Sequence, residues 1–82
     1  PTGVWIRSAQ YGASTGSPPT RDVTDVVRAR VQEGRLDMTV RNGTLGGDPA
    51  RRVVKKLFVV YTVDGGPEQR KDIYEGHRLI LP

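Results

Sequence analysis

One uninterrupted run, residues 53–63 (VVKKLFVVYTV), constrains the fold of this chain more than any other feature. It is rich in β-branched and aromatic residues and contains no glycine or proline, which is typical of a strand. Side chains alternate along a strand, so the run has two apolar faces. One face carries Leu57, Val59, Tyr61 and Val63, and the other carries Lys56, Phe58, Val60 and Thr62. The run must therefore lie inside the fold, where other segments supply its neighbours and its covers.

The length and composition indicate one small domain that spans residues 1–82. With 35% apolar and 27% charged residues, the chain can form one modest core. No window reaches the roughly 18 apolar residues of a membrane-spanning helix. The absence of cysteine excludes disulfides, thiolate catalysis and cysteine-based zinc sites. We therefore expect a domain without a membrane span or a cofactor, stabilised by packing alone.

The N-terminal segment 4–11 has the alternation of a strand, and Gly12 ends it. Unbroken alternation places Trp5 and Tyr11 on the same face. We expect the single tryptophan in the core, because its side chain brings the largest apolar surface. The alternative is that Trp5 and Tyr11 are exposed side by side and stack on a sugar ring.

Three more strands are predicted downstream. Residues 35–41 alternate strictly, with apolar side chains inward, as in a half-buried strand. Residues 69–74 are more polar and suit an edge strand, and residues 79–81 form a last short strand. The segment 42–52 is predicted to be one structured loop, because its glycines and proline leave no room for a partner strand.

The segment 23–33 fits either a helix or a strand. Its valines recur at helical spacing, Asp22 or Thr24 can cap the first turn, and Gly34 can end the helix. Valine and alanine also alternate with arginine in this segment, which is strand spacing, and valine loses side-chain freedom in a helix. The capping residues and Gly34 favour a short helix.

Together these segments predict a mainly β domain, a small antiparallel sheet or sandwich of about five strands with one short helix over about 23–33. The strand 35–41 should meet one face of the central run in the main core. The other face, which carries Phe58, needs a second cover, for which the segment 23–31 or Trp5 is the candidate.

The net charge is +4, and the basic residues are spread along the chain. Acidic residues interleave with them, which argues against a nucleic-acid-binding stripe. The densest basic cluster comprises Arg51, Arg52, Lys55 and Lys56, where the loop enters the central run. Such a cluster can hold an anionic ligand, but a solvated strand end is the simpler interpretation.

The sequence contains no recognisable catalytic constellation. His77 is the only histidine, no Gly-x-Ser-x-Gly motif is present, and we expect a surface histidine beside the Glu75-Gly76 turn. The glycine-rich stretch 43–49 lacks the Gly-Lys-Ser/Thr ending of a P-loop. We therefore predict that the chain is not an enzyme and holds no metal.

Several short motifs together resemble a known domain. They are Asp22-Val23-Thr24, Gly34-Arg35-Leu36, Asn42 with Leu45-Gly46-Gly47-Asp48-Pro49, Lys56-Leu57-x-Val59-x-Tyr61 and Glu75-Gly76-x-x-Leu79. This set resembles a C-terminal domain of unknown function that occurs in mitochondrial subfamily C J-domain co-chaperones and in bacterial and fungal proteins. The resemblance covers nearly the whole chain and implies a β-rich accessory module without catalytic residues. The His-Pro-Asp motif of a J domain is absent, so the resemblance does not extend to co-chaperone activity.

Two functions follow. The first is a non-catalytic interaction module that binds a protein partner or is appended to a larger protein. The second is a carbohydrate-binding accessory module, because the segment 22–27 is also similar to part of the galactose-binding-like jelly-roll modules of glycosidases. The candidate ligand-binding residues are Trp5, Tyr11, Asn42, Asp48, Arg51 and Arg52. Exposure of Trp5 beside Tyr11 favours the sugar interpretation, whereas burial of both rings removes its platform.

Overall fold

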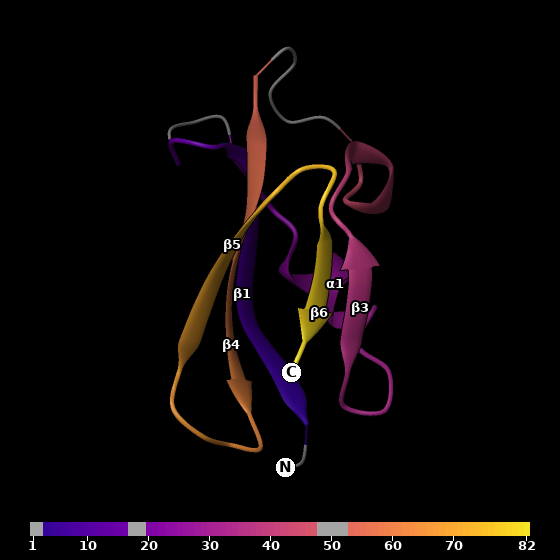
Figure 1. Cartoon of the computed structure of the whole chain (residues 1–82), viewed down its shortest axis with the longest axis vertical. Helices are drawn as coiled ribbons and strands as arrows, with labels where there is room; N and C mark the ends of the chain where they lie inside the picture. The colour runs from indigo at the N-terminus through magenta and orange to yellow at the C-terminus, as the bar shows by residue number, and fades with distance from the viewer. Residues whose placement is uncertain (1–2, 17–19, 48–52) are drawn as a thin grey trace.

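The computed structural model describes residues 3–16, 20–47 and 53–82. Within them the chain forms six strands in two antiparallel sheets, which confirms the mainly β prediction (Figure 1). The elements are β1 (Val4–Ala13), β2 (Thr20–Asp22), α1 (Thr24–Arg28), β3 (Leu36–Thr39), the 3-10 helix η1 (Asn42–Thr44), β4 (Lys55–Val63), β5 (Gln69–Tyr74) and β6 (Arg78–Leu81). The large sheet has the order β2-β1-β4-β5, and the small sheet pairs β3 with β6.

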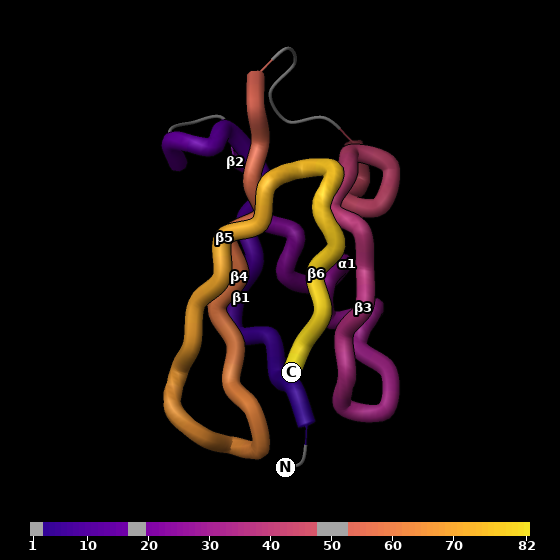
Figure 2. Tube along the Cα trace, in the orientation of Figure 1, coloured from indigo at the N-terminus to yellow at the C-terminus, as the bar shows by residue number. Residues whose placement is uncertain are grey.

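Strand β4 is central, as its sequence predicts. It pairs with β1 on one side and with β5 on the other, so that β5 is an edge strand, also as predicted. Figure 2 shows β4 running beside β1 along much of the molecule. The inner face of β4 is buried through Leu57, Val59 and Tyr61. The expected alternation of its two faces is therefore present.

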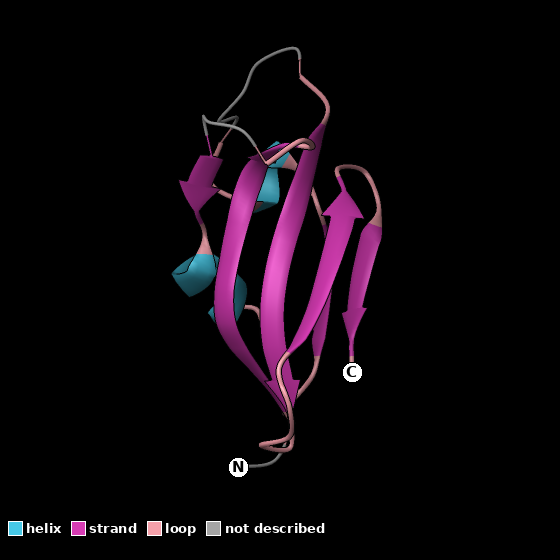
Figure 3. Cartoon of the chain, turned by 90° about the vertical axis from the view of Figure 1, so that its left-hand side faces the viewer, coloured by secondary structure: helices cyan, strands magenta, loops and turns pink. Residues whose placement is uncertain are grey.

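A single hydrophobic cluster fills the space between the inner face of the large sheet and the small sheet. It joins Leu57 and Val59 of β4 with Leu36 and Met38 of β3, as predicted. The outer face of the large sheet points the other way. In Figure 3 this face is turned toward the viewer, and no described helix or strand lies over its middle. The helices and strands that the structure describes thus cover one face of the large sheet only.

A β-bulge interrupts β1 between Ile6 and Ser8. The bulge adds one residue to β1, so the alternation of side chains reverses across it. Before the bulge Ile6 faces the core, and after it Tyr11 does. Trp5 is consequently 52% exposed, whereas Tyr11 is fully buried. The predictions that these two rings share a face and that Trp5 lies in the core are both wrong, as is the predicted strand end at Gly12.

The predicted helix over 23–33 is confirmed in type, but it is shorter than expected. Helix α1 contains five residues, and Val23 and Val27 beside and within it enter the main core. The segment and Trp5 were the two candidates for the cover of the Phe58 face of β4. The segment does not cover it, because these valines pack on the inner side of the sheet. Trp5 does lie on the outer face, opposite Thr62, and Phe58 is partly buried there.

Gly34 belongs to a tight turn into β3 and does not end α1. Gln32 and Arg35 exchange backbone hydrogen bonds of 2.8 and 2.9 Å, and Glu33 and Gly34 between them both have positive φ angles. The Gly34 carbonyl also accepts a 2.9 Å hydrogen bond from the Val4 amide. The turn therefore attaches the start of β3 to the start of β1.

Candidate binding surface on the outer sheet face

The outer face of the large sheet carries apolar and aromatic side chains along β4. Directly opposed residues of paired strands point to the same side of the sheet, so the register identifies the members of this face. Trp5 lies opposite Thr62 at one end, and Tyr74 lies opposite Lys56 at the other. We define the outer band as Trp5, Lys56, Phe58, Val60, Thr62 and Tyr74.

The ends of the outer band are its most exposed parts. Trp5 is 52% exposed and Tyr74 is 48% exposed, while Phe58 and Val60 between them are half-buried. Thr62 follows Lys56 by six positions, which makes the band about 20 Å long. Because the hydrophobic cluster lies on the opposite face of the sheet, the core does not require large aromatic rings at these two ends.

Each aromatic end is paired with a cation. The guanidinium carbon of Arg28 lies 4.4 Å from the centroid of the Trp5 ring, and the Lys56 ammonium lies 4.5 Å from the centroid of the Tyr74 ring. These distances are those of cation–π pairs, in which the cation sits over the electron-rich face of the ring. The pairing holds both rings in place on the sheet.

Arg28 is fixed by the backbone of the bulge. Its Nε donates a 2.8 Å hydrogen bond to the Ile6 carbonyl, and its Nη2 donates a longer one, of 3.4 Å, to the Arg7 carbonyl. Helix α1 lies along the edge of β1 at this point, where Thr24 Oγ1 accepts a 3.0 Å hydrogen bond from the Ala9 amide. The bulge, α1 and the Trp5 ring therefore form one connected unit.

A shallow polar depression of about 540 Å³ adjoins this unit, between the bulge and α1. Its polar groups contact one another. Asp22 accepts hydrogen bonds from the Thr24 hydroxyl, at 2.6 Å, and from the Thr24 amide, at 2.9 Å, and these two bonds hold the pKa of Asp22 below its usual range. The Asp25 carboxylate oxygen Oδ1 lies 3.8 Å from Nη1 of Arg28. Both carboxylates of the depression thus already interact with neighbouring residues of the chain.

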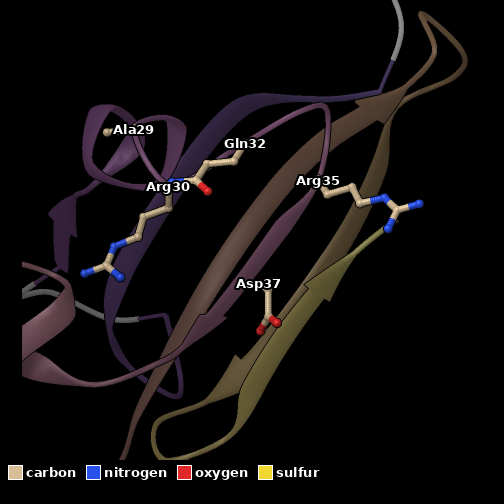
Figure 4. Close-up of a pocket in the computed structure, with 5 residues that line it drawn as sticks. All are labelled: Ala29, Arg30, Gln32, Arg35 and Asp37. Carbon is tan, nitrogen blue, oxygen red and sulfur yellow. The ribbon is translucent and has the colours of Figure 1, made fainter.

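A second depression, of about 320 Å³, lies between the end of α1 and β3. Figure 4 shows that the guanidinium groups of Arg30 and Arg35 point in opposite directions from it. Asp37, which also lines it, accepts a 2.7 Å hydrogen bond from Nε of Arg78, and the hydrogen bonds from Arg78 hold the pKa of Asp37 below its usual range. The charges around this depression do not converge on a common point.

The structure separates the candidate residues that the sequence suggests. Trp5 lies in the outer band, but the buried Tyr11 hydroxyl donates a 2.7 Å hydrogen bond to Oδ1 of Asn42 on the inner side of the sheet. Tyr11 and Asn42 thus contact each other and not Trp5. The other three candidates, Asp48, Arg51 and Arg52, lie outside the described residues.

The described part of the basic cluster is divided between the two faces of β4. Lys55 was expected in a solvated strand end, but its residue is only 3% exposed. Its ammonium lies 2.9 Å from the Val53 carbonyl oxygen and 3.4 Å from Oε1 of Glu75. Lys56 points to the outer face. His77 is exposed beside the Glu75-Gly76 turn, as predicted.

Over 3–16, 20–47 and 53–82, no three acidic, histidine or cysteine side chains gather where they could hold a metal ion. The same part of the chain contains no helix with the length and apolar character needed to cross a bilayer.

Sequence reasoning missed Tyr74 as a member of the outer band and Arg28 as the residue that lies over its Trp5 ring. Arg28 acquires its place through the bulge, and one signal of that bulge is present in the sequence. The apolar residues occupy even positions at Val4 and Ile6 but odd positions at Ala9 and Tyr11. Trp5 is also apolar and occupies an odd position, so the sequence fits an unbroken alternation equally well, and the change of parity becomes informative only once Trp5 is known to be exposed.

Comparisons with known proteins give no relative for this chain: no family model, no curated protein and no solved structure matches it. The resemblances to the co-chaperone C-terminal domain and to galactose-binding-like modules therefore stay predictions.

Proposed function

We propose that this chain is a non-catalytic interaction module that binds a protein partner through the outer band. One observation carries the proposal: Trp5 and Tyr74 are about half exposed on a sheet face that the core does not use. Exposed tryptophan and tyrosine are enriched among the residues that dominate binding energy at protein interfaces. The cations beside both rings hold them in place before a partner arrives, which lowers the entropic cost of binding.

We further propose that the module is an accessory part of a larger protein, as the resemblance to the co-chaperone C-terminal domain implies. Such a module contributes a binding surface, while any reaction takes place elsewhere. The outer band is suited to this role because it lies on the face opposite the small sheet. A partner can occupy it without disturbing the core.

A fragment-display selection tests the protein-binding proposal. Peptide fragments encoded by the genome of the source organism are selected on the wild-type chain and then measured against Trp5→Ala and Ile80→Ala. Ile80 is the matched control, because it is also 52% exposed but belongs to β6 of the small sheet. We expect the selected fragments to lose at least about tenfold in affinity for Trp5→Ala, as at interface hot spots, and to bind Ile80→Ala normally. Fragments that bind both variants as tightly as the wild type would refute the proposal.

The half-exposed Trp5 ring also favours a second candidate, a carbohydrate-binding module. Tyr11 is buried, so a sugar would stack on a single ring. A glycan array with the wild type and Trp5→Ala tests this candidate. Binding that disappears in Trp5→Ala supports it, and the absence of glycan binding by the folded wild type excludes it.

A further inference from the structure

We infer that two copies of this chain pair through the free edge of β5 and join their large sheets into one continuous antiparallel sheet. The inference goes beyond the proposed function and does not depend on it. Three properties of β5 carry it: an open edge, unpaired backbone groups along that edge, and a pattern of charge that matches a second copy of the strand in a single register.

Strand β5 ends the large sheet, and β4 is its only strand partner in the described part of the chain. The first four residues of β5 are all exposed, namely Gln69, Arg70, Lys71 and Asp72. Away from the turn that connects them, β5 and β6 diverge (Figures 1 and 2). The edge of β5 that faces away from β4 is therefore open over this part of the strand.

The register shows which backbone groups point to the open edge. In an antiparallel pair, every second residue exchanges hydrogen bonds with the residue opposite it, and the backbone groups of the residues between point away. The Glu75 amide donates a 2.9 Å hydrogen bond to the opposite Lys55 carbonyl, so the odd-numbered residues of β5 bond to β4. The amides and carbonyls of Arg70 and Asp72 consequently point to the open edge. Over 3–16, 20–47 and 53–82, these groups have no hydrogen-bond partner, and they form a template for another strand.

The charges of β5 fit a second copy of the same strand. A two-fold axis perpendicular to the sheet keeps the outer faces of both copies on the same side. With this axis at Lys71, Arg70 of each copy lies opposite Asp72 of the other, and both pairs lie on the outer face. Directly opposed residues of unlike charge stabilise paired strands. The same residues form the backbone hydrogen bonds between the copies, because their amides and carbonyls point to the open edge.

The neighbouring registers bring like charges together. With the axis at Asp72 the two Asp72 carboxylates are opposed, and with the axis at Arg70 the two guanidinium groups are opposed. The register centred on Lys71 opposes only the two Lys71 side chains. They lie on the other face of β5 and are exposed, so salt screens their repulsion. The charges thus select one alignment of the two copies and resist the others.

The contact is confined to two strands, so we expect a weak dimer that forms as the concentration rises. In this dimer the two four-stranded large sheets become one sheet, and the outer bands of both copies lie on the same face. Two bands on one face raise the avidity for a partner that carries two binding segments.

Sedimentation equilibrium from micromolar to millimolar concentration tests the inference, with variants that reverse each of the two paired charges. Arg70→Asp opposes two carboxylates at both pairs, and Asp72→Arg opposes two guanidinium groups. Each variant alone should dimerise at least about tenfold more weakly than the wild type. An equimolar mixture of the two variants should regain the association as a heterodimer, because unlike charges then lie opposite each other at both pairs. Circular dichroism verifies that each variant is folded.

Lys71→Gln is the control for the register. It removes the like-charge contact at the axis, so it should strengthen the dimer by about twofold. A loss of association in Lys71→Gln as large as that in Arg70→Asp would overturn the proposed pairing.

A wild type that stays monomeric at millimolar concentration also overturns the inference. So does a dimer that the charge reversals do not weaken, or one that the mixture of variants does not restore. None of these results affects the proposed function, because the fragment test with Trp5→Ala requires no dimer. Association that both single variants weaken and their mixture restores supports the inference.

Discussion

The Arg28 guanidinium lies over the Trp5 ring, 4.4 Å from its centroid, while its Nε donates a hydrogen bond to the carbonyl of Ile6. One side chain thus connects α1 to the bulge of β1 and to the most exposed aromatic ring of the outer band. Arg28 therefore affects both the geometry of the bulge and the position of the Trp5 ring on the candidate binding surface.

Arg28→Lys should therefore lower the free energy of unfolding by about 1–2 kcal/mol, because a lysine cannot reproduce the Nε hydrogen bond together with the stacked guanidinium. Urea denaturation measures this loss. Trp5 is the only tryptophan, so its fluorescence should also shift to longer wavelength as the ring becomes more hydrated. Arg30→Lys, at an exposed position just beyond α1, is the control and should change stability by less than about 0.5 kcal/mol. Equal losses in both variants would contradict the role assigned to Arg28.

Val59→Asp should unfold the domain, because it places an unpaired carboxylate in the centre of the core. Val60→Asp is the matched substitution on the outer face of the same strand, where the carboxylate can reach water. Circular dichroism and thermal melting of the two variants provide the comparison. We expect a cooperative melt for Val60→Asp and none for Val59→Asp. A Val59→Asp variant with an unchanged midpoint would show that β4 is not the centre of the fold.

Tyr11→Phe should destabilise the chain by about 1 kcal/mol, since it removes the hydroxyl that donates to Asn42 Oδ1 at 2.7 Å. Tyr61→Phe serves as the comparison, because the Tyr61 hydroxyl makes only a 3.4 Å contact with Gln69 and should contribute less. Denaturant titration of both variants measures the difference. A larger loss in Tyr61→Phe would be inconsistent with the observed geometry.

The pair formed by Asp37 and Arg78 predicts a pH dependence of stability. Hydrogen bonds from Arg78 lower the pKa of Asp37 in the folded chain. A carboxyl with a lowered folded pKa stabilises the fold above its unfolded pKa of about 3.9, and this contribution disappears as the pH falls through the folded pKa. The difference in unfolding free energy between the wild type and Asp37→Asn should therefore shrink from pH 7 to pH 2. In an Arg78→Gln background the change with pH should be smaller. A difference that grows toward acid would contradict the pairing.

Strand β4 was predicted from its unbroken run of β-branched and aromatic residues, and β5 was predicted as an edge strand from its polar composition. Alternation of apolar and polar residues was sufficient to predict β3, which keeps one phase from end to end. It failed for β1, where the phase changes at the bulge, and this failure misplaced Trp5 and Tyr11. The phase change depends on how β1 pairs with β4. The only trace of it in the local sequence is the parity of the apolar residues. Strand β2 was also missed, because all three of its residues are exposed and show no apolar periodicity.

The candidate surface was predictable only in part. The exposed-aromatic alternative named Trp5, but its expected neighbours Tyr11 and Asn42 lie elsewhere. The residue that contacts the Trp5 ring is Arg28. Tyr74 and Lys56 form the other end of the band, and they share this face through the pairing of β4 with β5. The pairing of strands determines which residues share a face. The number of residues between them in the sequence does not reveal this pairing.

The most direct test of the outer band as a binding surface is a two-dimensional NMR titration of the isotopically labelled chain with a peptide fragment selected on the wild-type chain. We predict that amide shifts concentrate in residues 5–8, 56–62 and 70–74 and that the Trp5 indole signal moves with them. Shifts concentrated in β3 and β6, with an unchanged Trp5 indole signal, would contradict the account.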